Sequence, residues 1–223
     1  MKFFTRFLAV MAVALSSITA PALAQEGASA SMKQVMPYLD TYYKIPPSDR
    51  TLIEIVHRIK SKSLPESQIK AWYEFEGKKV ELDLNDRGEL WQPPSLETYE
   101  ANPRIYTNIA MGDIVLATRI RPDIPMTTSM SGDDLRKCLV EADRGIKKVS
   151  GWFAFLRPKV KGYHIELKPK STAEIIYADG KTKKLKVTTM SPVNASLFLD
   201  RDDLKGATEV KFSNAPHHMR FED

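Results

Sequence analysis

The sequence predicts a mainly β protein, α+β when its one long helix is counted, with two antiparallel β-sandwich-like lobes joined by an amphipathic helix. Three observations predict this class. Short runs rich in β-branched and aromatic residues recur along most of the chain. Gly, Pro and Asn-Asp turns separate these runs at short intervals, which favours antiparallel strands over parallel β-α-β units. Only one segment, near the middle of the chain, carries agreeing helix signals.

The central segment, residues 131–156, predicts one helix followed by a buried strand. Ser131 with Asp134 three residues later makes a capping-box pattern, and acidic residues suit the start of a helix. Lys147, Lys148 and the following Gly151 predict that the helix ends near residue 149. Residues 152–156 form an aromatic run typical of a strand. One apolar stripe with helical spacing is made by Leu135, Cys138, Leu139, Ala142, Ile146 and Val149.

The only cysteine, Cys138, lies on this stripe. We interpret it as a small buried hydrophobic residue and not as a reactive thiol. With one cysteine the chain has no intramolecular disulfide, so its stability comes from its core.

The first 24 residues have the features of a cleaved signal peptide. Lys2 and Arg6 precede an apolar run at residues 7–15, and residues 22–24 supply the small-x-small site that a signal peptidase accepts. We therefore expect a periplasmic or secreted protein that starts at Gln25. No later segment approaches the roughly 20 apolar residues of a membrane span. Because Gln25 and not cysteine follows the cleavage site, a bacterial lipid anchor is not expected.

Residues 25–47 are predicted to form an irregular lead-in, since Pro37 would interrupt a helix there. The first β lobe is predicted over residues 48–125. Its residues 51–59 alternate and are β-branched, which favours a strand over a helix beginning at Ser48. A turn at residues 76–78 predicts a hairpin between two of the strands. Further strands are predicted at residues 69–75, 80–84, 89–91, 104–109 and 113–120.

Residues 126–150 are predicted to form a linker and the central helix, and residues 151–223 the second β lobe. The Asp179-Gly180 turn predicts another hairpin. The two halves share their Gly and Pro punctuation, but no aligned repeat of residues indicates a duplication. A single large sheet is the alternative arrangement. The strands of the second lobe are predicted at residues 152–156, 163–168, 172–177, 183–187, 196–199 and 208–212.

Composition excludes some classes of function. The 223 residues carry a formal net charge of +5, with 43% hydrophobic and 27% charged residues, as in ordinary globular proteins. Basic and acidic residues are interleaved, so no nucleic-acid partner is expected. Phosphate-loop, dinucleotide-binding and common hydrolase motifs are absent. His57 and His164 fall within predicted strands and are interpreted as packed or surface histidines.

The one local group of coordinating atoms is near the C-terminus. His217, His218 and Met219 offer imidazole and thioether ligands, which suit copper or zinc in an exported protein. Neighbouring residues of a strand point to opposite faces, so a metal site would need a further ligand from elsewhere. An exposed terminal strand is the simpler interpretation, and no other cofactor is expected.

Trp91, next to Gln92 and two prolines, is the candidate for an exposed platform that stacks on a glycan or another flat apolar ligand. Trp72 and Trp152 lie within apolar runs and are expected in the core.

These features favour an exported binding or envelope accessory module without catalysis, whose partner is an envelope protein, a glycan or a lipid. An envelope hydrolase with dispersed active-site residues is the alternative, because triad members meet in space and not in sequence. The hydrolase predicts convergent titratable groups in a cleft. The binding module predicts a shallow or apolar surface patch.

Overall fold

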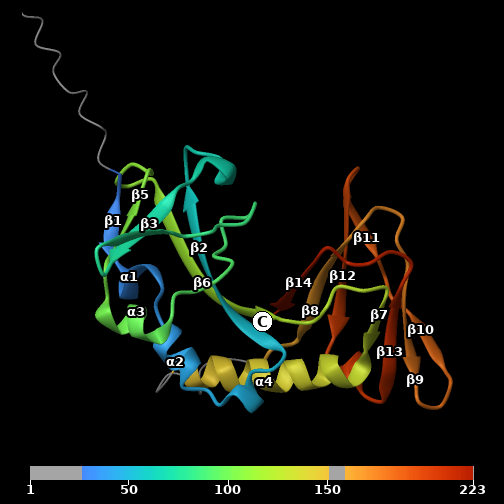
Figure 1. Ribbon diagram of the computed structural model, residues 1–223. Helices are drawn as coiled ribbons and strands as arrows, with labels where there is room; N and C mark the ends of the chain where they lie inside the picture. The colour runs from blue at the N-terminus through green and yellow to red at the C-terminus, as the bar shows by residue number, and fades with distance from the viewer. Residues whose placement is uncertain (1–26, 151–158, 223) are drawn as a thin grey trace, which may run out of the picture.

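The computed structural model describes residues 27–150 and 159–222, which form a mainly β protein of the α+β class (Figure 1). Four antiparallel sheets are divided between two lobes, and both lobes lie on the same side of one long helix, α4. The predicted signal peptide, the Gly151 cap and the predicted strand at residues 152–156 lie outside the described residues. No helix in the described ranges is long and apolar enough to cross a membrane.

The first lobe contains one four-stranded sheet of order β1-β5-β3-β4 and one two-stranded sheet, β2-β6. The predicted strand at residues 51–59 is confirmed as β2. The predicted hairpin is also confirmed, with Trp72 opposite Glu81 and Phe75 opposite Lys78. The elements are β1 (Ser29–Ser31), α1 (Met32–Val35), α2 (Leu39–Tyr43), η1 (Pro47–Asp49), β2 (Ile53–Ser61), η2 (Glu66–Gln68), β3 (Ala71–Phe75), β4 (Lys78–Glu81), α3 (Leu96–Ala101), β5 (Arg104–Thr107) and β6 (Ile114–Pro122).

The second lobe contains two four-stranded sheets of order β10-β9-β13-β7 and β11-β12-β8-β14. The Asp179-Gly180 turn joins β9 to β10, as predicted. The elements are β7 (Ser129–Ser131), α4 (Gly132–Ser150), β8 (Gly162–Leu167), β9 (Ala173–Tyr177), β10 (Thr182–Lys184), β11 (Thr188–Ser191), β12 (Asn194–Asp200), η4 (Asp202–Leu204), β13 (Ala207–Phe212) and β14 (His218–Glu222).

The expectation of an irregular lead-in at residues 25–47 is wrong. This segment contains β1, α1 and α2, and Pro37 lies in the break between the two short helices. Met32, Met36 and Leu39 are fully buried. Short helices have little stability by themselves, so it is this burial in the first lobe that maintains them. The strand predicted at residues 89–91 is reduced to single bridges from Glu89 to Arg58 and from Leu90 to Leu84.

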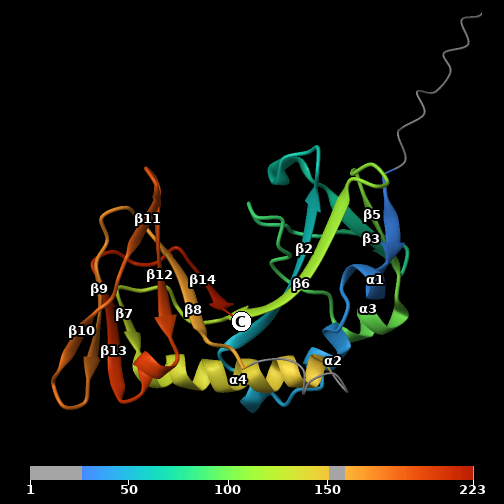
Figure 2. The same ribbon diagram turned by 180° about the vertical axis from the view of Figure 1, so that it is seen from behind.

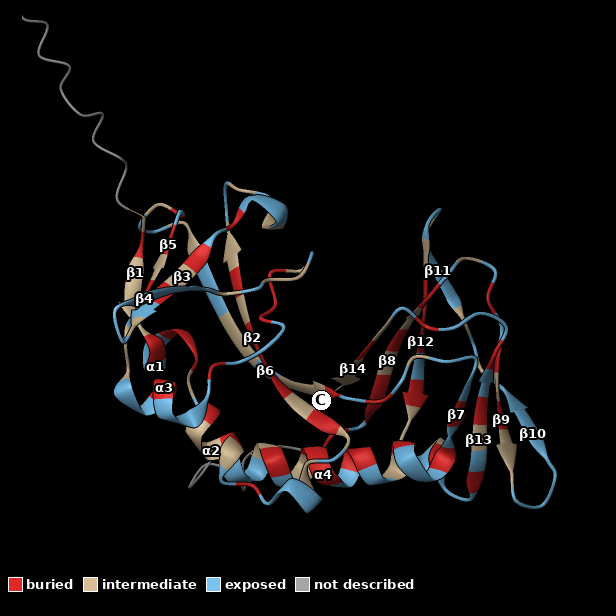
Figure 3. Cartoon of the chain, viewed as in Figure 1, coloured by how far each residue is buried: buried red, intermediate tan, exposed pale blue. Residues whose placement is uncertain are grey.

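The apolar stripe of α4 is confirmed by the burial pattern. Leu135, Cys138, Leu139 and Ala142 are all buried, and Figure 3 shows buried and exposed residues alternating along the helix. Ser131 Oγ accepts a hydrogen bond from the Asp134 backbone N–H at 3.2 Å, as the capping pattern predicted. The Cys138 thiol donates to the Leu52 carbonyl at 3.0 Å, and burial raises its pKa to about 12. Cys138 is therefore a buried structural residue.

Polar side chains of α4 attach the helix to both lobes. Glu141 accepts hydrogen bonds from the Leu52 backbone N–H at 2.7 Å and from Thr51 Oγ1 at 2.8 Å, at the start of β2. On the other side, Arg136 donates to the carbonyls of Leu204 and Ala207, each at 2.6 Å. The helix thus connects the two lobes through the buried Glu141 and the partly buried Arg136 as well as through its apolar stripe.

The two lobes repeat one backbone plan. The order β1-β5-β3-β4 corresponds strand for strand to β7-β13-β9-β10, and the β2-β6 pair corresponds to β8-β14. In each lobe the first strand leads directly into a helix, which is α1 in one and α4 in the other. Three hydrogen bonds of the first lobe have an equivalent in the second. In the first lobe they run from Leu82 N to Ala71 O, from Lys70 N to Asn108 Oδ1 and from Thr107 N to Ala28 O. Their equivalents run, in the same order, from Leu185 N to Ala173 O, from Thr172 N to Ser213 Oγ and from Phe212 N to Thr128 O.

The backbone therefore repeats although the sequence shows no aligned repeat of residues. Equivalent residues are separated by different lengths of chain, for example Ser29 from Ser129 and Ala71 from Ala173. Connections of unequal length shift the alignment, so no fixed period exists in the sequence. Local matches survive, since residues 60–63 and 168–171 both have the pattern Lys-x-Lys-Ser.

Candidate functional site

The two lobes meet at β6 and the equivalent strand β14 (Figure 1). A group of ion-paired side chains lies at this junction. The turn between the bridged residues Leu84 and Leu90 and strand β8 complete this junction. Domain interfaces are a common place for binding and active sites. We call the group the interlobe polar cluster; it consists of Glu54, Arg87, Glu89, Arg121, Glu166, His217 and His218.

On the first-lobe side, Arg121 bridges two carboxylates. Its Nε lies 2.5 Å from Glu54 Oε1 and its Nη1 lies 2.8 Å from Glu89 Oε2. Glu89 is only 3% exposed, and Asn85 Nδ2 donates to the same carboxylate at 3.2 Å. Asn85 Oδ1 in turn accepts from the Glu89 backbone N–H at 3.0 Å. The buried charge of Glu89 is thereby paired and hydrogen-bonded, as a buried carboxylate requires.

Glu166 on β8 connects the two lobes electrostatically. Its Oε2 lies 3.7 Å from Arg87 Nη2 of the first lobe and 3.5 Å from His217 Nε2. Burial lowers the pKa of half-buried His218 below its ordinary value, and the positive charge of Arg87 acts in the same direction. Both effects favour the uncharged form of the His218 imidazole.

The predicted metal ligands are only partly brought together. His217 and His218 lie in the cluster, whereas Met219 is 1% exposed and lies opposite Ile165 of β8, among the core residues of the second lobe. Among the described residues, no group of three or more His, Cys, Asp or Glu side chains is placed to hold a metal ion. The copper or zinc site stays a prediction.

Trp91 is 64% exposed, and its backbone N–H donates to the Asp83 carbonyl at 2.9 Å. Its role as a ligand platform stays a prediction. Trp72 differs from expectation, because it is only partly buried. Its ring stacks on Tyr106 at 6.0 Å between centroids, and the Lys79 ammonium lies 4.7 Å from the Trp72 ring centroid. Trp72 therefore lies on the outer surface of its sheet.

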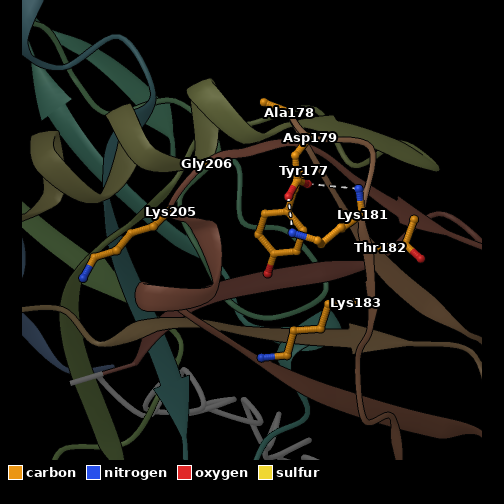
Figure 4. Close-up of a pocket in the computed structure, with 8 residues that line it drawn as sticks. All are labelled: Tyr177, Ala178, Asp179, Lys181, Thr182, Lys183, Lys205 and Gly206. Carbon is orange, nitrogen blue, oxygen red and sulfur yellow. Dashed lines mark hydrogen bonds and ion pairs between the residues drawn. The ribbon is translucent and has the colours of Figure 1, made fainter.

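A surface depression of about 510 Å³ lies beside the β9-β10 hairpin (Figure 4). Three lysines line it, but each is paired with an acid. Lys181 lies 2.7 Å from Asp179, Lys183 lies 2.5 Å from Asp203, and Lys205 lies 2.9 Å from Asp202. The depression therefore offers little free positive charge to an anionic ligand and is the weaker candidate. Its lining residues are Tyr177, Ala178, Asp179, Lys181, Thr182, Lys183, Lys205 and Gly206.

His57 is a buried titratable group close to the cluster in sequence but on the core face of β2. It is 1% exposed, and its Nδ1 lies 3.0 Å from Thr118 Oγ1. Its Nε2 has no hydrogen-bond partner within the described ranges. Burial lowers the pKa of His57 to about 4. Its interpretation as a packed histidine is confirmed, and the missing partner makes its protonation unfavourable.

We expect His57 to make the fold sensitive to acid. The unfolded chain binds this proton near pH 6.5 and the folded chain only near pH 4, so stability falls as the pH drops through that window. The loss amounts to about 3 kcal/mol at pH 4 and below. Urea unfolding at several pH values measures it. The variant His57→Leu should show a flatter dependence than the control His217→Gln; equal slopes in the two variants would contradict the prediction.

The fold and the cluster together define a two-lobed, internally duplicated α+β protein with an ion-paired junction. No family model matches the chain, and comparisons with curated proteins and with solved structures find no match either.

Proposed function

We propose that the protein is an exported binding or accessory protein of the cell envelope that acts without catalysis. Export is supported by the charged start, apolar run and small-x-small site of residues 1–24. The proposal that the protein acts without catalysis rests on the ion pairs within the interlobe polar cluster. The carboxylates of Glu54 and Glu89 are bound by Arg121, and that of Glu166 lies between Arg87 and His217.

These pairings favour a structural junction over an active site. A general acid or base needs access to substrate and a pKa near the working pH. Glu89 is buried in its ion pair, and His218 has no serine or cysteine hydrogen-bonded to it among the described residues. The Cys138 thiol is fully buried with a pKa of about 12, which disfavours a nucleophilic role.

Exposed apolar side chains support a binding role. The most exposed large apolar residues of the described chain are Val193, Met111, Met190 and Trp91, at 79%, 76%, 67% and 64%. Such residues mark contact surfaces when they occur together.

The experiment combines isolation and assay. Protein recovered from the extracytoplasmic fraction should begin at Gln25 by intact mass, and an uncleaved chain retained in the cytoplasm would overturn the export proposal. The isolated protein should not hydrolyse ester, peptide or glycoside substrates. A turnover that Glu166→Gln and His218→Gln abolish, but that the control Glu209→Gln outside the cluster retains, would favour the hydrolase alternative.

A further inference from the structure

We propose that the end of the molecule opposite α4 docks on an anionic lipid surface through apolar side chains at the tips of both lobes. The inference rests on the proposed envelope function and names the partner. Within residues 27–150 and 159–222, the three most exposed large apolar side chains all belong to this end: Met111 lies in the loop between β5 and β6, Met190 on β11 and Val193 in the turn between β11 and β12.

The two tips lie on the same side of the protein. The loop between β5 and β6 and the turn between β11 and β12 are both at the end away from α4, in two views that differ by 180° (Figures 1 and 2). Val115 and Leu116, at the start of β6, are also exposed and extend the apolar surface of the first tip. Exposed apolar side chains on separate tips suit insertion into the boundary between lipid headgroups and acyl chains.

Lysines accompany the apolar residues in both lobes. The repeated Lys-x-Lys-Ser pattern spans the end of β2 in the first lobe and directly follows β8 in the second, so it lies at the same end of both strands. Lys62 Nζ donates to the Gly112 carbonyl at 2.8 Å, which places its ammonium beside Met111. Leu167, just before Lys168, pairs with Ala195 of β12, which lies two residues after Val193.

Most of these lysines are free to meet an external anion. Lys60 is paired with Glu66 at 2.7 Å, whereas Lys62, Lys168 and Lys170 form no ion pair within residues 27–150 and 159–222. Basic side chains near an anionic membrane each add attraction, which falls off with salt. Free ammonium groups beside protruding methionine and valine side chains are complementary to anionic lipid headgroups over an apolar interior.

Vesicle sedimentation tests the proposal. The protein should lack residues 1–24, because their apolar run would itself enter lipid. It should bind vesicles of equal parts phosphatidylglycerol and phosphatidylcholine, with little binding to phosphatidylcholine alone. The double variant Met111→Asp/Val193→Asp should weaken binding about tenfold or more. The control Val140→Asp introduces the same charge at an exposed position of α4 and should leave binding unchanged.

Lys168→Gln/Lys170→Gln should weaken binding and also reduce its dependence on salt. Any of three results would overturn the proposal of lipid docking. These are no binding to anionic vesicles, vesicle binding by Met111→Asp/Val193→Asp that equals that of the wild type, or an equal loss of vesicle binding in the control Val140→Asp. A soluble protein or glycan ligand with no vesicle binding would overturn this inference and leave the envelope function standing. An uncleaved, cytoplasmic chain would instead overturn the proposed function, whatever the vesicles show.

Discussion

Replacing Arg121 with methionine is expected to destabilise the folded protein by about 3–5 kcal/mol. The guanidinium pairs with Glu54 at 2.5 Å and with Glu89 at 2.8 Å, and Glu89 is only 3% exposed. Methionine fills a similar volume but leaves the Glu89 carboxylate as a buried charge without its counter-ion. That uncompensated charge, and not the lost contact, makes the effect large. Urea unfolding followed by circular dichroism measures the change.

Two further variants test the cause. Arg119→Met changes an exposed arginine two residues earlier on β6 and should alter stability by no more than about 0.5 kcal/mol. The double variant Arg121→Met/Glu89→Leu removes both charges and should recover most of the stability that the single variant loses. The buried charge is not the cause of the destabilisation if Arg121→Met has the same free energy of unfolding as Arg119→Met. The same holds if Arg121→Met/Glu89→Leu is no more stable than Arg121→Met.

Glu141→Ala is expected to cost about 3 kcal/mol and to loosen the attachment of α4 to the first lobe. Glu141 is 2% exposed and accepts from the Leu52 N–H and from Thr51 Oγ1. Its loss leaves the backbone N–H of Leu52 unpaired inside the protein and opens a small cavity. Glu141→Gln keeps the volume and one acceptor oxygen and should cost about half as much.

Hydrogen exchange locates this effect. The Leu52 amide and the neighbouring amides of β2 should lose protection in Glu141→Ala, while β8 keeps its own. Asp134→Ala, an exposed acid on the first turn of the same helix, is the matched control and should cost less than about 1 kcal/mol. Uniform loss of protection in both lobes would mean that Glu141 stabilises the whole fold and not the junction of α4 with β2.

Several local features follow from the sequence alone. The helix beginning after Ser131, the hairpins at Gly77 and Gly180 and the strand at β2 all match their predictions. Each is specified by neighbouring residues: a cap, a turn residue with positive φ or an alternating pattern. Cys138 was likewise placed by helical spacing, which assigns a face without knowledge of what covers it.

The candidate site was only partly predictable. The sequence singles out His217 and His218 as possible metal ligands, because imidazole nitrogens coordinate copper and zinc, but it does not predict their place in the cluster. Their partner Glu166 is about fifty residues away in the chain, and Arg87 comes from the other lobe. No local pattern signals a pairing that depends on two lobes meeting.

By itself, then, the sequence determined the fold class, the long helix and most strands, because these depend on contacts within a few residues. The tertiary structure decided the rest. It ordered the lead-in, since α1 and α2 exist only where Met32, Met36 and Leu39 are buried. It revealed the duplication, which connections of unequal length conceal in the sequence. It also assembled the interlobe polar cluster and brought both tips to one end, since such long-range arrangements depend on how packed elements meet and leave no periodic pattern along the chain.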